Sequence, residues 1–256
     1  MSTAYHHILT TLQTYASAEK AQILQRFFKT GKGEYGEGDK FLGVTVPDIR
    51  KVAKQYLCAS QSGEKNLNIT DIESLLHSER HEARMCALLM LVELCKPALL
   101  RKGGEPMHRL GGFNTYEGVN LYLRHTAYIN NRDLVDLSAP AIIGHYYFDK
   151  DRSKLYELAA SPSLRERRIA IIATFYFIKK GQHEDTFRLA ELLLQDQHDL
   201  IQKAVWRMLR EVWKRIDEQL LCSFLDLYAS VMPRTMLRYA IERLPETVRK
   251  DYLSKK

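Results

Sequence analysis

Two aspartates one helical turn apart are the first candidates for chemistry in this chain. Asp133 and Asp136 lie in the segment 130–140, with Leu134 and Val135 between them. At least one of the two carboxylates is therefore expected beside apolar packing, where its burial costs free energy unless a cation or a hydrogen-bond donor compensates it. Arginine-rich segments elsewhere in the chain can supply that compensation. The pair marks the first candidate site.

The composition is that of an ordinary globular protein. The chain has 256 residues, of which 45% are hydrophobic, enough to bury a full core as a single domain, 1–256, or as one elongated array. The net charge of +7 favours a polyanionic partner through counterion release. A mildly basic chain can also be simply soluble, so charge alone does not decide the partner.

The sequence lacks the signals of export or membrane insertion. No basic flank followed by an apolar segment stands at the N-terminus, and no apolar run approaches the ~20 residues that cross a bilayer. We therefore expect a cytoplasmic protein that does not associate with membranes. The cysteines form no CxxC pair, so we predict reduced core residues rather than a zinc site or a disulfide framework. They are Cys58, Cys86, Cys95 and Cys222.

The hydrophobic pattern predicts helices nearly throughout, because apolar residues recur at i, i+3, i+4 and i+7 and no alternating run of useful length occurs. Thr70-Asp71-Ile72-Glu73 fits a capping box, and Pro47 suits a first helical turn. About a dozen helices joined mostly by short turns are expected. Their approximate ranges are 3–28, 47–58, 70–77, 81–96, 115–129, 132–148, 152–160, 164–180, 184–196, 198–216, 217–231 and 233–244.

An internal period indicates how these helices are organised. Arg168, Lys203 and Arg238 are spaced 35 residues apart in similar helical contexts, and Arg84 has a similar context upstream. A repeat of this length made of two antiparallel helices is typical of an α-solenoid. Stacked units would line the four cations along one concave surface that can follow a phosphate backbone. The alternative, solvated residues that merely flank a core stripe, remains open.

Other motifs are weaker. Residues 31–36 match G-x-G-x-x-G, but no strand precedes them and nearby acidic residues would repel a pyrophosphate, so we expect a structured connection instead. His81 lacks the second histidine of a zincin, and no nucleophile elbow is present. Trp206 and Trp213 share one helix face, which favours core packing over base stacking.

Several longer motifs resemble the AlkD-like DNA alkylation-repair glycosylases, and the resemblance covers nearly the whole chain. The motifs are residues 28–44, Val46-Pro47-Asp48-Ile49-Arg50, residues 130–140, Glu166-Arg167-Arg168-Ile169-Ala170-Ile171, Gln202-Lys203-Ala204-Val205 with Leu209-Arg210-Glu211, and Met232-Pro233-Arg234-Thr235.

The resemblance implies an all-α fold, a superhelical array of antiparallel HEAT-like helix pairs that cradles double-stranded DNA. It further implies a monofunctional glycosylase that excises cationic N3- and N7-alkylated purines without a metal or another cofactor. Asp136 matches the catalytic aspartate of the family, and Arg168 matches an arginine used near the DNA backbone. A monomer without an obligate protein partner is expected.

Two departures bear on activity. The resemblance places tryptophans at positions that flank the lesion, where their ring faces favour its positive charge. This chain has Arg132 and Arg207 there, and Trp206 is displaced by one position, about 100° round the helix. An arginine beside the lesion would repel a cationic base, grip a phosphate, or pair with an aspartate. The stretch 96–114 also departs from the pattern and resembles an inserted loop.

Three classes of function therefore remain open. The first is a glycosylase for alkylated purines, weakened or shifted in substrate. The second is a HEAT-like DNA-binding protein that keeps the cradle but has lost efficient excision. The third, a protein-interaction scaffold, is disfavoured by the presence of Asp136 and of the basic stripe.

Overall fold

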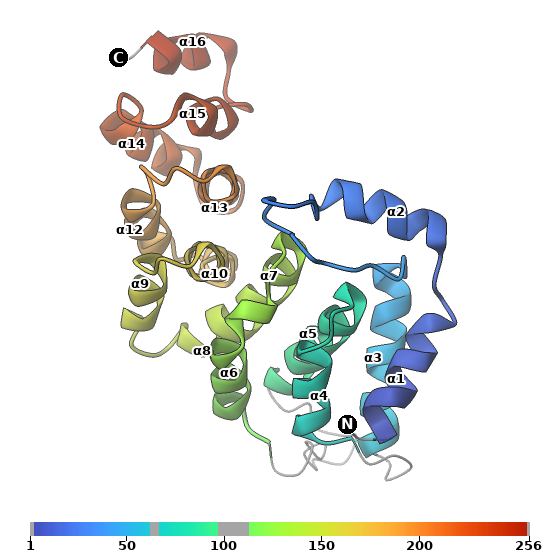
Figure 1. The fold of residues 1–256 in the computed structure, drawn as a ribbon. Helices are drawn as coiled ribbons and strands as arrows, with labels where there is room; N and C mark the ends of the chain where they lie inside the picture. The colour runs from blue at the N-terminus through green and yellow to red at the C-terminus, as the bar shows by residue number, and fades with distance from the viewer. Residues whose placement is uncertain (1–2, 62–66, 97–112, 255–256) are drawn as a thin grey trace. The chain divides into compact units, whose positions relative to one another are not determined.

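The computed structural model describes residues 3–61, 67–96 and 113–254, and over these ranges the chain is helical apart from turns and one isolated bridge, Lys40 with Arg80 (Figure 1). The predicted all-α fold is confirmed. Two compact units make up the chain, residues 1–138 and 139–256. Most of the inserted loop predicted at 96–114 lies outside the described residues. Within them, no helix is long and apolar enough to cross a membrane.

The first unit is built around α5, His81–Cys95, in which nearly every residue is buried. This helix contacts α1, α3, α4 and α6, so it is enclosed on several sides and carries apolar residues all round. The other helices of this unit are α1 (Thr3–Gln13), α2 (Ala18–Phe27), α3 (Val46–Gln61), α4 (Ile69–Leu76), α6 (Thr115–Arg124), the short 3-10 helix η2 (Thr126–Tyr128) and α7 (Arg132–Ala139).

The second unit consists of stacked helix pairs. The helices α10, α13 and α15 are successive neighbours, with α9, α12 and α14 packed beside them (Figure 1). Stacking of this kind buries one continuous core, as in repeat proteins. The elements are η3 (Pro140–Gly144), α8 (His145–Tyr147), α9 (Ser153–Ala159), α10 (Leu164–Ala173), α11 (Phe175–Lys179), α12 (Glu184–Leu192), α13 (Asp199–Arg215), α14 (Glu218–Tyr228), α15 (Arg234–Ala240) and α16 (Glu246–Ser254).

One local motif starts three of the helices. Three residues before α5, α10 and α13, a side-chain oxygen accepts a hydrogen bond from the backbone amide two residues further on, a turn that precedes helices. The donor and acceptor are Arg80 N and Ser78 Oγ (3.2 Å), Ser163 N and Ser161 Oγ (3.1 Å), and His198 N and Asp196 Oδ1 (2.8 Å). The three helix starts are therefore structurally equivalent.

A second hydrogen bond recurs in the same three helices and shows which of their residues are equivalent. A side chain in the first turns donates to the carbonyl oxygen six residues before it. The bonds join Arg84 Nη1 to Ser78 O (2.7 Å), Arg167 Nη1 to Ser161 O (3.1 Å) and Gln202 Nε2 to Asp196 O (2.9 Å). Arg84 is therefore equivalent to Arg167, and the sequence-based alignment of Arg84 with Arg168 is wrong by one position.

Helix boundaries differ from the prediction where capping decides them. The capping box of α4 uses Asn68 and Asp71, two residues before the predicted Thr70 pair, with both reciprocal bonds present. The predicted helix 3–28 is two helices, because Ser17 caps a second one. The predicted helix 164–180 is interrupted at Thr174, and α16 was not predicted. Pro47 does lie in the first turn of α3.

The segment after α7 continues as a π-helix because of a proline. Pro140 has no amide hydrogen, so the carbonyl of Asp136 cannot receive the i+4 hydrogen bond of an α-helix. The π-helical turn η3 spans Pro140–Gly144. At its end a side chain on Gly144 would lie 2.2 Å from the carbonyl oxygen of Ala173, so only glycine allows α10 to approach this closely.

The cysteines are unpaired by disulfides, but they are not all core residues. Cys86 and Cys95 are buried as predicted, whereas Cys222 is half-buried and Cys58 is exposed on α3. Burial raises the pKa of the Cys86 thiol to about 12. Cys86 is therefore an inert packing residue.

Candidate functional site

Helix α7 presents the two aspartates of the candidate site. Leu134 and Val135 are fully buried, while Asp133 and Asp136 are half-buried on the same helix. The expectation that a carboxylate lies beside apolar packing is therefore confirmed. The two aspartates differ in their surroundings, and this difference separates their roles.

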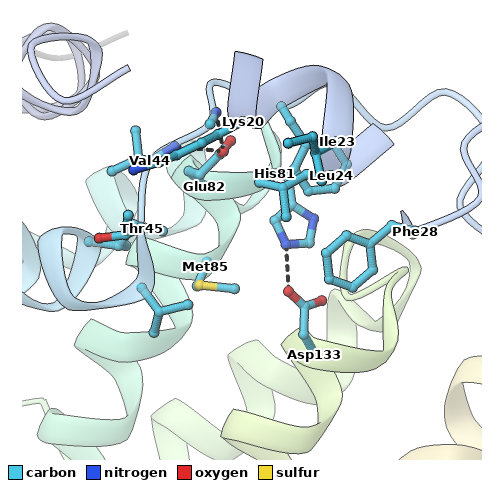
Figure 2. A pocket seen from close by; sticks show the side chains of 14 residues that line it. Lys20, Ile23, Leu24, Phe28, Val44, Thr45, His81, Glu82, Met85 and Asp133 are labelled. Carbon is cyan, nitrogen blue, oxygen red and sulfur yellow. Dashed lines mark hydrogen bonds and ion pairs between the residues drawn. The ribbon is translucent and has the colours of Figure 1, made fainter. Parts of the chain in front are cut away.

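Asp133 belongs to a chain of polar contacts that ties α7 to α5. Its Oδ2 lies 2.9 Å from Nε2 of His81 (Figure 2). On the other side of the ring, Nδ1 of His81 lies 3.0 Å from Oδ2 of Asp39. Both ring nitrogens face carboxylates, which requires an imidazolium or a proton on one of the carboxyl groups. Asp133 is thereby held as a positioning residue at the start of α7.

The inner carboxylate of this chain is compensated by further donors. Asp39 is 3% exposed, forms a short ion pair with Arg84 and accepts a hydrogen bond from Asn131 Nδ2 at 3.2 Å. Arg84 is itself buried. A buried ion pair of this kind is strongly destabilised when one partner is removed, because an uncompensated charge is left behind. Arg84 therefore acts inside the first unit and does not lie on the predicted cationic surface.

Asp136 lies near a buried phenol. Tyr122, on α6, is fully buried and its hydroxyl lies 3.0 Å from Oγ of Ser138. Burial raises the pKa of Tyr122, the Ser138 hydrogen bond lowers it, and the negative charge of Asp136 raises it further. Tyr122 therefore keeps its proton at neutral pH, which excludes it as a base and leaves the carboxylate of Asp136 as the group suited to stabilise positive charge.

Arg132, one turn before Asp136, is stacked on aromatic rings of α2. Its guanidinium carbon lies 4.5 Å from the centre of the Phe27 ring and 5.5 Å from that of Phe28. Phe27 is 59% exposed. Arginine stacks favourably on such ring faces. A positive charge and an exposed aromatic ring therefore stand together near Asp136.

An apolar cavity of about 360 Å³ adjoins the His81 contacts (Figure 2). It is lined mainly by α2, α5 and the segment before α3, and Asp133 and His81 also contribute. Glu82 holds this segment, because its carboxylate accepts hydrogen bonds from the amides of Leu42 (2.9 Å), Gly43 (2.8 Å) and Val44 (3.3 Å).

The glycine-rich segment before this cavity is a structured connection, as predicted. The amide of Gly31 donates to Glu34 Oε2 at 2.9 Å, and the amide of Gly33 donates to Glu37 Oε2 at 2.8 Å. Backbone amides that would cradle a phosphate in a nucleotide loop are thus bound by carboxylates of the chain itself.

The basic residues of the second unit fall into two groups. Arg168 is 6% exposed and donates from Nη1 to the carbonyl oxygen of Leu200 at 2.6 Å. Lys203 is partly exposed and pairs with Asp199 at 2.8 Å, and Arg238 is exposed. The predicted stripe therefore has two accessible members, Lys203 and Arg238, whereas Arg168 joins neighbouring helices.

Comparisons with known proteins identify the family to which the chain belongs. A family model described as DNA alkylation repair enzyme matches residues 8–244. The chain belongs to this family. A solved structure described as a predicted DNA alkylation repair enzyme from Enterococcus faecalis is 18% identical, with a TM-score of 0.67, and the match covers 92% of this chain and 100% of that one. At this identity the likeness shows the fold. No curated protein matches.

In this member of the DNA alkylation repair family, Trp206 is neither a core residue nor isolated. Its ring is half-buried and stacks on Tyr239 of α15, with ring centres 5.0 Å apart and planes inclined by 16°. The guanidinium of Arg210 lies 4.5 Å from the Trp206 ring centre. Arg207, the next residue, is half-buried on the same helix. The expectation of core packing for Trp206 is thus replaced by an aromatic and cationic cluster.

Sequence reasoning identified Asp133 and Asp136 but missed the residues that hold them. Asp39 and His81 lie 94 and 52 residues before Asp133, so no local pattern connects them. One signal lies in the sequence: polar side chains recur at the same distance from the start of each repeated helix. By this distance Arg84 is equivalent to Arg167, an equivalence that the apolar pattern alone did not reveal.

Proposed function

We propose that this DNA alkylation repair family member is a DNA glycosylase that excises cationic N3- and N7-alkylated purines from duplex DNA. Asp136 is the catalytic residue, and the reaction needs no metal or other cofactor. The observation that carries the proposal is the position of Asp136 in the first unit. It is half-buried near the buried Tyr122, on a helix whose start is tied to the buried Asp39 by Asp133 and His81.

The chemistry suits a fixed carboxylate. In an alkylated purine the base already carries positive charge, so the bond from C1′ of the sugar to the base nitrogen breaks with its electron pair going to the base. The base leaves neutral, and the sugar passes through an oxocarbenium-like state that a nearby anion stabilises. Water then attacks C1′ and loses a proton. Asp136 is the anion and orients the water.

Lys203 and Arg238 are the residues to which we assign contacts with DNA phosphates. Both are accessible, and the ion pair of Lys203 with Asp199 is at the surface, where such pairs contribute little and exchange readily. Arg84 and Arg168 are buried and hydrogen-bonded within the repeats, so we assign them to the fold.

The second candidate function, DNA binding without efficient excision, is favoured by one observation. Arg132 places a positive charge one helical turn from Asp136, where a cationic lesion would have to lie. Repulsion between the guanidinium and the lesion opposes the stabilisation that Asp136 provides. Excision of an uncharged substrate would not suffer this repulsion.

The decisive experiment measures release of methylated purine bases from alkylated duplex DNA by the purified full chain. Asp136→Asn keeps the size of the side chain and removes its charge, and we expect it to lower the rate by about 100-fold or more, as removal of one electrostatic stabiliser does in other enzymes. Asp149→Asn, which removes an exposed carboxylate, is the matched control and should keep the parent rate.

The other outcomes discriminate between the functions. No release by the parent, together with tight and salt-sensitive binding of duplex, would establish a DNA-binding protein without excision. If the parent neither releases bases nor binds duplex DNA, a protein-interaction scaffold is the function that remains. Equal release by the parent and by Asp136→Asn would overturn the assignment of Asp136.

A further inference from the structure

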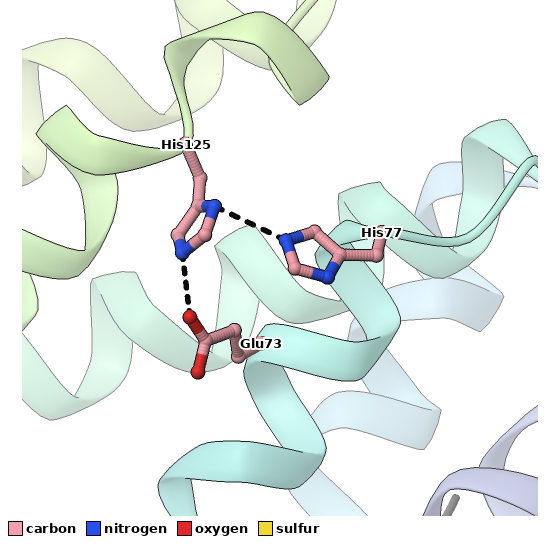
Figure 3. A group of neighbouring side chains, drawn as sticks. All are labelled: Glu73, His77 and His125. Atoms are coloured by element: carbon pink, nitrogen blue, oxygen red, sulfur yellow. Dashed lines mark hydrogen bonds and ion pairs between the residues drawn. The ribbon is translucent and has the colours of Figure 1, made fainter.

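Three side chains that commonly bind metals meet between two helix ends of the first unit (Figure 3). Glu73 and His77 come from the last turn and the C-cap of α4, and His125 is the C-cap of α6. Nε2 of His77 lies 3.1 Å from Nδ1 of His125, and Nε2 of His125 lies 2.6 Å from Oε1 of Glu73. One ligand atom from each residue lies within 4.8 Å of the others.

The surroundings of this cluster favour a cation. Both histidines stand at helix C-termini, where the last carbonyl groups and the helix dipole give a negative potential. Glu73 adds a carboxylate. Two imidazoles with a carboxylate beside them are a donor set that suits Zn²⁺, an ion of borderline softness that prefers nitrogen ligands and tolerates oxygen ligands.

We propose that His77 and His125 bind a Zn²⁺ ion directly and that Glu73 is the positioning residue for His125. Bonds from zinc to imidazole nitrogen of ~2.0–2.1 Å at a tetrahedral angle separate two ligand nitrogens by about 3.4 Å. The two nitrogens that face each other are 3.1 Å apart, so a small opening of the pair admits the ion.

The existing hydrogen bonds define how the ion is held. Nε2–H of His125 donates to Glu73, which leaves Nδ1 of the same ring with a lone pair toward His77. His77 binds the ion in the tautomer that carries its proton on Nδ1, so that Nε2 also offers a lone pair. Such a carboxylate partner fixes the ring orientation of a metal-bound histidine and raises its basicity. His77 is exposed, so water completes the coordination from the solvent side. The ring of Tyr128, 4.4 Å from that of His77, stands beside the site.

The ion would link α4 to the end of α6, two helices that are far apart in the sequence. Since it binds the folded arrangement only, it stabilises the first unit by an amount that rises with the logarithm of the zinc concentration above the dissociation constant. The proposed excision reaction requires no metal, so this site stands apart from the assignment of Asp136. No metal site is predicted from the sequence, since it has neither a CxxC pair nor the second histidine of a zincin, and the spacing of Glu73 and His77 is the remaining local signal.

The test uses the full chain freed of metal by a chelator and titrated with zinc chloride alone. Binding is measured by competition with a chromophoric chelator, and thermal unfolding is followed with and without zinc. We expect one ion per chain and a higher melting temperature with zinc. His77→Ala should remove the zinc-dependent shift, and Glu73→Gln should weaken binding by about 10–100-fold, as loss of a supporting partner typically does.

Control variants test whether other histidines or a loss of folding account for the effect of zinc. His6 and His7 are adjacent exposed histidines on α1, and replacing both with alanine should leave binding unchanged. Because His77 is exposed, His77→Ala should fold normally, which circular dichroism without zinc verifies. His125→Gln, whose amide nitrogen can take the place of the imidazole Nε2, keeps a donor for Glu73 without the Nδ1 ligand and serves as the second variant if stability falls. No stoichiometric binding by the parent, or undiminished binding by both histidine variants, would overturn the proposal.

Discussion

At the scale of single residues, the proposed excision requires a cationic base to lie between the charges of Asp136 and Arg132. Its guanidinium is held against the rings of Phe27 and Phe28, at 4.5 and 5.5 Å from their centres, so the charge is fixed in place. A cationic lesion at Asp136 is attracted by the carboxylate and repelled by this guanidinium. The balance of the two terms sets the rate of the proposed excision.

This balance predicts a gain of activity on substitution. Arg132→Trp, alone and combined with Arg207→Trp, should raise the release of cationic N7-methylguanine, because an aromatic face attracts a cation by about 0.5–2 kcal/mol, or about 2- to 30-fold in rate. The measurement is base release from methylated duplex under single-turnover conditions. Arg50→Trp, which makes the same exchange at an exposed site on α3, should have the parent rate.

An uncharged base is the second control for this prediction. If repulsion by Arg132 is the cause, the gain must be confined to the cationic lesion. An equal gain on an uncharged base, or no gain by the double variant, would show that these arginines do not limit excision.

The residues that hold the site were the hardest to predict. The spacing to Asp136 indicates Asp133, but no pattern in the sequence joins Asp133 to His81 or to Asp39. Buried polar contacts between residues this far apart depend on the tertiary fold, and one sequence contains no local signal for them. Arg84 shows the same limit, since its charge predicted a surface role and its hydrogen bonds place it inside.

At the scale of the elements, periodicity predicted where helices exist, and capping decided where they begin. The apolar spacing continues through Ser17, yet that side chain accepts the amide hydrogen bond that starts α2. The same holds for α4, where Asn68 takes the role predicted for Thr70. Cap residues supply one hydrogen bond each and leave no trace in the apolar pattern, which explains why the boundaries were predicted less well than the helices.

The cap of α4 gives a quantitative prediction. Asn68→Ala removes the acceptor for the amide of Asp71 and should lower the free energy of unfolding by about 0.5–2 kcal/mol, the usual range for an N-cap. Ser74→Ala is the matched control, because Ser74 lies inside α4 and its hydroxyl bonds the carbonyl oxygen of Thr70 rather than the cap residue. Urea denaturation of both variants measures the difference. A larger loss for Ser74→Ala than for Asn68→Ala would show that the cap is not at Asn68.

At the scale of the whole molecule, the 35-residue period could be predicted from the sequence, but the exact residues that are equivalent in each repeat could not. Arg167 and Gln202 make the same bond to the carbonyl six residues before them, which confirms the period in the second unit. One position on a helix changes the direction of a side chain by about 100°, so an error of one residue exchanges a buried side chain for an exposed one.

The accessible positions of the repeat predict the salt dependence of DNA binding. Each phosphate contact releases counterions, so Lys203→Ala and Arg238→Ala should each lower duplex affinity and reduce the slope of log affinity against log salt by about one. Fluorescence anisotropy of a labelled duplex at several salt concentrations measures the slope. Lys250→Ala, which removes the same charge from α16, should leave it close to that of the parent.

The control separates a contact from a general effect of charge. If the three variants reduce the slope equally, the net charge of the protein attracts DNA and the repeat phase is irrelevant. If Lys203→Ala and Arg238→Ala both keep the parent slope, neither residue contacts a phosphate, and duplex DNA must bind another surface. A loss confined to these two residues would tie DNA binding to one position of the helical repeat, the position that follows Arg167 and Gln202 by one residue.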